Sequence, residues 1–358
     1  MLLALVACLA AACTGSPVVT TSSRLPPPPA SSEPPPLPSF TLAAGGDILV
    51  HPLLTEQADR DGDRDFVPLL DGLRPAIDAD LSICHLETPL SEPGAPTYGY
   101  PAFSAPPEIA TALKTIGYDS CSTASNHTLD RGSGAIKTTL DVLDAAGLHH
   151  TGSFRTPAES STPLLLDAKG VKVGHIAFTY GFNGIPLPQP WMANQLSVEG
   201  VLDAARAARA AGAEVVVASL HWGAEYQHEA TPEQREMAAA ILADPAVDLI
   251  IGTHVHAVQP IERINGKWVV YGMGNEVARH SEPRGITEEG IVTRFKFVKG
   301  AGGWTVEHAE YIPTLVEFGP PIRVVDLTRS PATPRRTEAL ARTDGVVRSM
   351  GVQGLGRP

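Results

Sequence analysis

Between residues 40 and 327 short apolar runs alternate with helical stretches, and this alternation limits the possible folds more than any other feature. Apolar runs such as 214–220 and 247–252 predict strands that are buried on both faces, because a half-exposed strand would alternate with polar residues. Helices are predicted at residues 106–117, 133–147, 198–212 and 231–244 from helical spacing with start and stop residues. The pattern predicts an α/β fold in which helices cover a sheet on both faces.

Hairpins interrupt this alternation. Residues 162–180 predict two strands joined at Lys169-Gly170, and residues 257–272 predict two strands joined at Asn265-Gly266. Residues 291–298 and 304–313 complete the set as antiparallel strands. The sheet is therefore expected to be mixed, or to be split into two packed sheets.

The chain divides into four parts by composition. Residues 1–13 form a short apolar segment that resembles the end of a secretory signal, and 14–39 form a Pro- and Ser-rich tether. Residues 40–327 form the globular domain, and 328–358 predict a short helix with a frayed end. A lipid on Cys8 or on Cys13 would anchor the domain to the outer face of the cell membrane, and a cleaved signal without lipid is the alternative. Either arrangement predicts an extracytoplasmic protein.

Two cysteines, Cys84 and Cys121, remain in the domain. In an exported protein such a pair can form a disulfide, but both lie in apolar, strand-like contexts that also suit two buried thiols. The formal net charge is −12 without a basic run, which argues against nucleic acid and anionic membrane surfaces as partners. An anionic polymer could be approached only through a local positive feature, which a bound metal would supply.

Polar residues with ligating side chains follow five of the predicted strands. They are Asp47 and His51 after the first strand, Glu87 after 81–84, Asn126 and His127 after 119–124, His221 after 214–220, and His254 and His256 after 247–252. The carboxyl ends of strands are where open α/β sheets bind ligands. Carboxylate, amide and imidazole together suit Mn²⁺, Fe²⁺ or Zn²⁺, and a central carboxylate that bridges two ions is typical of two-metal hydrolases.

Each residue also has a simpler explanation when taken alone. Asp47 can be a turn residue, His51 a surface histidine, and Asn126 a helix cap. The pair His254 and His256 is the strongest single signal, because alternation along an extended segment would place both on one face. The five sites taken together, in order and all at strand ends, predict a metal site.

The motifs resemble those of the CapA-type capsule-synthesis (poly-γ-glutamate) family. The blocks are GGDILVH, HLETPL, SNHTLDRG, HWGAEY, GTHVHAVQP and YGMGN, and they span about residues 41–275. The family resembles the calcineurin-like metallophosphoesterases. This resemblance implies a layered α-β-β-α sandwich with two central mixed sheets flanked by helices.

The resemblance also implies roles for individual residues. Asp47 and His256 would hold one metal, Glu87 would bridge, and Asn126, His221 and His254 would hold the second. His127 would face the substrate and protonate a leaving group, while Glu225 and Asp130 would orient imidazoles. Gln259, Asn275 and Tyr271 are further pocket candidates. The chain departs from the pattern twice. Leu49 stands where the phosphoesterases have a second histidine, with His51 as the nearest substitute. His85 replaces the family's usual asparagine before Glu87, and the sequence leaves open whether it ligates, hydrogen-bonds or does neither.

These observations predict a tethered protein of capsule or poly-γ-glutamate biosynthesis with one or two divalent ions. Its partners would be an anionic extracellular polymer or a phosphoester substrate, with a membrane-bound polymer synthase as a further partner. The alternatives are a metal-dependent phosphoesterase or hydrolase of a cell-envelope substrate, and a metal-dependent polymer-binding module.

Overall fold

The computed structural model describes residues 7, 10–16, 37–60, 63–281 and 285–357. Residues 37–358 form one compact unit, and residues 1–36 form a separate one. Most of the predicted signal and tether, with Cys8, lies outside the described residues, whereas Cys13 is an exposed free thiol. Among the described residues no helix has both the length and the apolar character needed to span a bilayer.

The larger sheet is built around β1 (Ser39–Ile48). The order of its strands is β16-β15-β14-β1-β4-β5-β6, with β13 paired to β1 and β17 to β15. The other strands of this sheet are β4 (Leu81–Leu86), β5 (Ser120–Ser122), β6 (His149–Thr151), β13 (Asn275–Val277), β14 (Glu289–Gly300), β15 (Gly303–Glu317), β16 (Arg323–Asp326) and β17 (Leu355–Gly356). β4 runs parallel to β1 and β14 antiparallel to it, so the sheet is mixed.

The smaller sheet has the order β11-β12-β10-β9-β8-β7. Its strands are β7 (Leu164–Ala168), β8 (Val171–Thr179), β9 (Val215–His221), β10 (Leu249–Thr253), β11 (Ile261–Ile264) and β12 (Lys267–Val270). Both predicted hairpins are present, and their turn residues have the positive φ angles that short hairpin turns require, for example +52° at Asn265 and +81° at Gly266. A two-stranded ribbon, β2 (Asp59–Arg60) with β3 (Asp63–Arg64), lies apart from both sheets.

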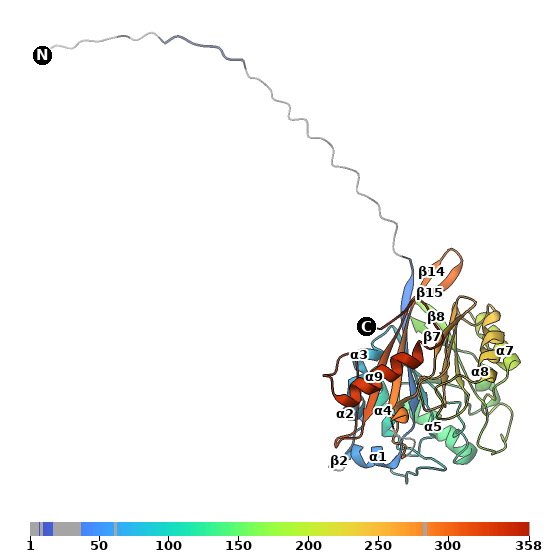
Figure 1. The fold of residues 1–358 in the computed structure, drawn as a ribbon. Helices are drawn as coiled ribbons and strands as arrows, with labels where there is room; N and C mark the ends of the chain where they lie inside the picture. The colour runs from blue at the N-terminus through green and yellow to red at the C-terminus, as the bar shows by residue number, and fades with distance from the viewer. Residues whose placement is uncertain (1–6, 8–9, 17–36, 61–62, 282–284, 358) are drawn as a thin grey trace. The chain divides into compact units, whose positions relative to one another are not determined.

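Helices cover the outer faces of the two sheets (Figure 1). The helices of the first half are α1 (Pro52–Ala58), α2 (Val67–Leu70), η1 (Asp71–Leu73), α3 (Arg74–Ile77), α4 (Glu108–Ile116), α5 (Gly132–Ala146) and α6 (Pro157–Ser160). They are followed by α7 (Val198–Ala210), α8 (Pro232–Ala243), η2 (Ile286–Glu288) and α9 (Pro334–Val347). Side chains of α2 to α5 pack with the outer face of the larger sheet, and those of α7 and α8 with the outer face of the smaller one.

A third apolar layer lies between the two sheets. Phe40 and Leu42 of β1 share one buried cluster with Val215 and Val217 of β9 and Ile251 of β10. The predicted α-β-β-α sandwich of two mixed sheets is therefore confirmed. Successive side chains of β4 point to opposite faces of the sheet, so this strand contributes to two apolar layers. Ile83 points between the sheets, while Cys84 points to the helices.

The helix predicted in residues 328–358 is present as α9, but the part after it is not frayed. Residues 328–358 were expected to be a short helix with a frayed end, but α9 packs on β14 and β15, and Leu355 pairs with Ala309 of β15. Val347 of α9 is fully buried in the cluster between the sheets. The tail was misread because its buried apolar residues are few and far apart in the sequence.

Cys84 and Cys121 are joined by a disulfide. They stand opposite each other on the neighbouring strands β4 and β5, with a Cα–Cα distance of 4.4 Å. The sequence left open whether these cysteines are bridged or are two free thiols. The register of β4 and β5, which cannot be read from the sequence, decides for the disulfide.

Candidate metal centre

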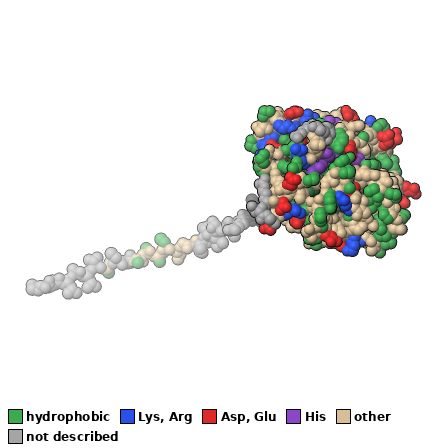
Figure 2. Space-filling view, turned by 90° about the horizontal axis from the view of Figure 1, so that it is seen from below, with side chains coloured by type: hydrophobic (Ala, Val, Ile, Leu, Met, Phe, Trp, Pro, Cys, Tyr) green, Lys and Arg blue, Asp and Glu red, His purple; other side chains and the backbone are tan. Residues whose placement is uncertain are grey.

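Five loops or strand ends bring the predicted polar residues to one edge of the sandwich. Asp47 is the last but one residue of β1, Glu87 follows β4, and His221 ends β9. Asn126 lies in the turn after β5, and His254 and His256 follow β10. In the space-filling view histidine side chains gather on one face of the molecule (Figure 2).

The ligating atoms of these residues converge. Three buried groups have their candidate atoms within 4.8 Å of one another: Asp47, Glu87 and His256; Glu87, His221 and His254; and Asp47, His85 and His221. The first two groups share Glu87, which is the arrangement that the resemblance implies. Bonds to Zn²⁺ are about 2.0–2.3 Å long, so atoms this close can share a cation.

Several of these atoms are buried without a hydrogen bond. They are Asp47 Oδ2, both carboxylate oxygens of Glu87, His85 Nε2 and His254 Nδ1. Burying polar atoms without partners is costly, and carboxylate oxygens are the most costly of all. These carboxylate oxygens do have ionic contacts with His256. Its Nδ1 lies 3.1 Å from Asp47 Oδ2, and its Nε2 lies 3.6 Å from Glu87 Oε1. A divalent cation would satisfy this donor set.

Burial dominates the electrostatics of the site. It raises the pKa of Glu87 well above its usual value, and it lowers the pKa of His254 to about 3 and of His85 to about 4. His256 is the exception: although burial lowers its pKa, Glu87 and Asp47 raise it to about 10. The neutral imidazoles of His254 and His85 keep a lone pair for a metal. The raised pKa of His256 shows that Glu87 and Asp47 favour a positive charge beside them, which a metal cation would also supply.

Loop contacts hold the two carboxylates in place. The Glu87 amide donates to Ile48 O at 3.2 Å, and Ser125 Oγ donates to Glu87 O at 2.6 Å. The amide of His254 donates to Asp47 Oδ1 at 3.0 Å. Ser125 therefore positions Glu87, and Asn126 is no cap of α5, because this helix begins only at Gly132.

Asn126 and His221 touch directly. Asn126 Oδ1 lies 2.8 Å from His221 Nε2, and Asn126 Nδ2 donates to Asn183 Oδ1 at 3.1 Å. The Asn183 contact turns the amide oxygen of Asn126 towards the site. The other nitrogen of His221 lies 3.3 Å from Thr253 Oγ1.

His127 stands beside the centre with one nitrogen occupied. Its Nδ1 lies 2.7 Å from Asp130 Oδ2, and its Nε2 lies 4.0 Å from Glu87 Oε1. The same Asp130 oxygen accepts from the amide of Phe103 at 2.7 Å. Asp130 thus fixes the ring, and Nε2 is the atom that can exchange a proton at the centre.

The structure does not bring His51 into any of the three ligand groups. Its Nδ1 lies 3.0 Å from Leu49 O and accepts from the amide of Arg279 at 3.1 Å, as the chain turns into α1. The ring of His280 lies 4.9 Å from that of His51 and 4.7 Å from that of His256. His280 therefore neighbours both His51 and the predicted ligand His256.

The prediction that His254 and His256 lie on one face of an extended segment was wrong. The two residues are not in an extended segment but in a bend with φ angles of +94° and +53°. Their rings are 6.1 Å apart and belong to two different ligand groups. Within this bend the amide of His254 donates to Asp47 Oδ1.

Glu225 lies at the exposed rim. Among the described residues its carboxylate makes no hydrogen bond to an imidazole; its hydrogen-bond partner is Tyr226. Of the further pocket candidates, Asn275 Oδ1 lies 3.0 Å from His256 Nδ1. Gln259 instead supports the loop after β9 through Gln227 O, and the Tyr271 hydroxyl donates to Glu262.

Of four further residues at the centre, only His85 was named from the sequence, as the residue that replaces the family's asparagine. His85, His280, Asn183 and Tyr180 all lie there, with the Tyr180 ring 4.5 Å from that of His254. His85 carried a usable signal, because it stands two residues before Glu87 and strand alternation puts both on one face. Asn183 and Tyr180 follow β8, which contributed no residue to the predicted set.

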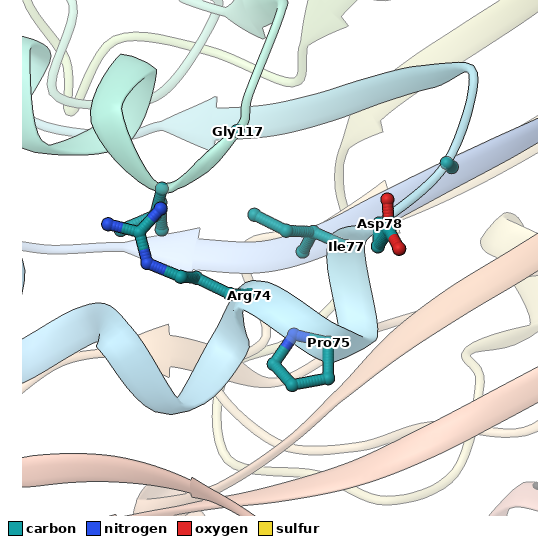
Figure 3. Close-up of a pocket in the computed structure, with 7 residues that line it drawn as sticks. Arg74, Pro75, Ile77, Asp78 and Gly117 are labelled. Atoms are coloured by element: carbon teal, nitrogen blue, oxygen red, sulfur yellow. The ribbon is translucent and has the colours of Figure 1, made fainter.

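A surface pocket of about 450 Å³ lies elsewhere, at the amino end of β4 (Figure 3). Arg74, Ile77, Asp78 and Gly117 are among its lining residues, and none of these was a predicted site residue. The Arg74 guanidinium is already bound to Asp71 Oδ1 at 2.6 Å and to Thr115 O at 2.6 Å. The ligating side chains thus gather at the opposite, carboxyl ends of the strands.

Known proteins are similar to this chain in sequence. Capsule biosynthesis protein CapA of Bacillus anthracis is 27% identical over 179 residues, 49% of this chain and 43% of that protein. PGA biosynthesis protein CapA of Bacillus subtilis (strain 168) is 26% identical over 206 residues, 55% of this chain and 51% of that protein. The chain thus spans about half the length of the curated relatives it matches.

Solved structures with similar backbones include a 5′-nucleotidase precursor from Thermus thermophilus. Its TM-score is 0.47 at 15% identity, over 85% of this chain and 58% of that chain. The calcineurin-like phosphoesterase YfkN from Bacillus subtilis has a TM-score of 0.45 at 18% identity, over 86% of this chain and 97% of that one.

The family model for bacterial capsule synthesis protein PGA_cap matches residues 41–280, which is more than half of the chain and includes every predicted ligand. The chain therefore belongs to the PGA_cap family of bacterial capsule synthesis proteins, to which its CapA-type motifs pointed.

Proposed function

We propose that this protein acts outside the cytoplasm in the synthesis or export of an anionic capsule polymer such as poly-γ-glutamate, through a divalent metal centre. Membership of the capsule-synthesis family supports the process. The observation that carries the metal centre is the set of unpaired, buried carboxylate and imidazole atoms that converge on Glu87. Asp47 and His256 would hold one ion, Asn126, His221 and His254 would hold the other, and Glu87 would be shared between them.

Hydrolysis is the chemistry that the centre favours. A pair of Mn²⁺, Fe²⁺ or Zn²⁺ ions supplies Lewis-acid activation of water and neutralises phosphoryl oxygens. His127 is the chain's own proton donor, because Asp130 holds its Nδ1 and leaves Nε2 facing Glu87. The His127–Asp130 pair therefore favours a hydrolase over a module that only binds polymer carboxylates through a metal.

Two observations support a place outside the cytoplasm. The disulfide between Cys84 and Cys121 is of a kind that persists in oxidising compartments and is rare in the cytosol. The apolar start of the chain and the Pro-rich residues 14–39 suit a signal and a tether, with lipid on Cys8 or Cys13. In that place the domain meets the extracellular polymer or a phosphoester of the cell envelope, next to a membrane-bound polymer synthase.

Metal content of the full-length protein tests the centre. We expect close to two equivalents of Mn²⁺, Fe²⁺ or Zn²⁺ in the wild-type protein and a large loss in Glu87→Gln, which removes the bridging charge but keeps the shape. Glu276→Gln is the matched control, since Glu276 is also a buried carboxylate but bonds Tyr118 and belongs to none of the ligand groups. A wild-type protein that binds no divalent metal would rule out the centre.

Turnover separates the two remaining functions. Hydrolysis of phosphomonoesters or phosphodiesters by the metal-loaded protein, lost in Glu87→Gln and in His127→Ala, supports the hydrolase. Metal binding without turnover of either ester class, together with retention on immobilised poly-γ-glutamate, supports the binding module instead.

A further inference from the structure

We propose that His85 is a further ligand of this metal centre and binds through its Nε2 atom. This inference rests on the proposed metal centre and adds to it a ligand from within a strand. The position is one at which the family motif usually has asparagine, so the ligand would be particular to chains that carry histidine there.

The register of the larger sheet places His85 beside Asp47, on the face of β4 that also carries Glu87. β4 lies between β1 and β5, and His85 pairs with Asp47 on one side and with Ser122 on the other. Partners in parallel strands project to the same face, and alternation puts Glu87 on that face as well. The intervening residue Leu86 packs with the outer helices. His85 thus faces the space between the sheets, next to the two carboxylates.

A hydrogen bond sets the tautomer of His85. Ser122 Oγ lies 2.7 Å from His85 Nδ1, and the same hydroxyl donates to Cys84 O at 3.5 Å. We assign Nδ1–H as the donor in the short contact with this hydroxyl. The lone pair is then on Nε2, which is the form of histidine that binds metals, with its other nitrogen held by a neighbour.

The Nε2 atom has no other role in the structure. His85 is 2% exposed, and Nε2 is buried without a hydrogen-bond partner. A ring nitrogen of His85 lies within 4.8 Å of ligating atoms of Asp47 and His221. The His85 and His221 rings are 4.8 Å apart at their centroids, so both imidazoles border the same small space.

A second buried histidine shows what a purely structural imidazole looks like here. His175 of β8 is fully buried between the sheets, and both of its nitrogens are occupied, Nδ1 at 3.1 Å from Ser120 Oγ and Nε2 at 2.9 Å from Ser219 Oγ. It belongs to none of the ligand groups. His85 differs from it in that one nitrogen is left open towards the carboxylates.

His85 also takes the place of the histidine that the phosphoesterases have in the loop after the first strand and that this chain lacks. Leu49 stands two residues after Asp47, and its side chain is buried against Phe103 and Ala278. His51 is held away by its contacts with Leu49 O and Arg279. The imidazole beside Asp47 that the loop does not supply is therefore supplied by the neighbouring strand.

Cobalt titration of the full-length protein tests this assignment, with His85→Ala, Ser122→Ala and the matched control His175→Ala. We expect His85→Ala to weaken Co²⁺ binding by at least about tenfold and to change the visible absorption of the bound Co²⁺. Ser122→Ala should weaken binding less but in the same direction, because the ring loses its orientation. His175→Ala should keep the affinity and the spectrum of the wild type.

The outcomes separate this inference from the proposed function. A wild type that binds Co²⁺, with His85→Ala equal to it in affinity and spectrum, overturns the ligand and leaves the centre intact. A wild type that binds no Co²⁺ overturns the centre itself. If thermal melting shows that His85→Ala does not fold, Ser122→Ala decides, and equality with the wild type then overturns the assignment.

Discussion

At the scale of single residues, the pair of His127 and Asp130 determines what the centre can do. We predict that His127→Gln lowers the rate of phosphoester hydrolysis by about 10²–10⁴-fold, because the positioned proton donor is lost. Metal content should not change, since His127 lies 4.0 Å from Glu87 and outside the ligand groups. Steady-state kinetics with metal analysis on the same samples measure both. An unchanged kcat in His127→Gln would show that this histidine donates no proton.

Glu276 makes a prediction about pH. It is 2% exposed, the hydroxyl of Tyr118 donates to one of its oxygens, and burial raises its pKa to about 8. Between the usual pKa of 4.5 and this value the folded state holds a proton that the unfolded state has lost. Stability contributed by this group should therefore fall as pH rises from 5 to 8, by at most about 1.4 kcal/mol per pH unit.

Urea unfolding at several pH values, with a chelator present, measures this slope. Glu276→Gln has no titrating carboxyl, so its slope over pH 5–8 should be less negative than that of the wild type. Equal slopes in the two proteins would contradict the assignment.

At the scale of elements, two glycines allow β13 to lie against the end of β1. A methyl group on Gly46 would overlap the carbonyl oxygen of Gly274, to which the Asp47 amide donates at 2.9 Å. A backbone carbonyl cannot move aside cheaply. We predict that Gly46→Ala lowers the free energy of unfolding by about 1–3 kcal/mol or more. Gly134→Ala, in α5 with no atom near the added methyl, is the control that should lose no stability.

The helix α9 is tied to β14 by a buried ion cluster. Glu289 is 1% exposed, and Arg335 Nη1 and Arg342 Nε bind its two oxygens at 2.7 and 2.9 Å. Removing both arginines leaves a buried carboxylate without its ion pairs, so Arg335→Ala/Arg342→Ala should lose about 3–5 kcal/mol in chemical denaturation. Arg206→Ala breaks only exposed pairs and should lose about 1 kcal/mol or less. A similar small loss in both proteins would show that α9 is not held by this cluster.

At the scale of the whole molecule, the disulfide closes a loop of the larger sheet. Cys84 and Cys121 are 37 residues apart in sequence and bind β4 to β5 directly beneath the Glu87 and Asn126 turns. We expect Cys84→Ala/Cys121→Ala to unfold at lower denaturant, with a loss of about 2–4 kcal/mol. Its metal affinity should stay close to that of the wild type, since both sulfurs point to the helices. A metal affinity that falls with the disulfide would show that the bridge also shapes the centre.

Most of the architecture was predictable because it follows from local patterns. The predicted buried runs form β9 and β10, and the Asn265-Gly266 and Lys169-Gly170 turns close the expected hairpins. The helix α8 begins at Pro232, after Thr231 as its N-cap residue with a full capping box. The tail was not predictable in the same way. The contacts of α9 are made with β14 and β15 and appear in no local pattern.

By itself, the sequence determined the layered α/β class, the family and the residue types of the centre, since hydrophobic periodicity and strand-end motifs are properties of neighbouring residues. Only the tertiary structure decided which of those residues meet. It left His51 outside the three ligand groups, placed His85 in one of them, bent the backbone at His254 and paired Cys84 with Cys121. The physical reason is that metal ligation and disulfide geometry depend on distances of a few ångströms between strands, and strand register and loop bends set those distances.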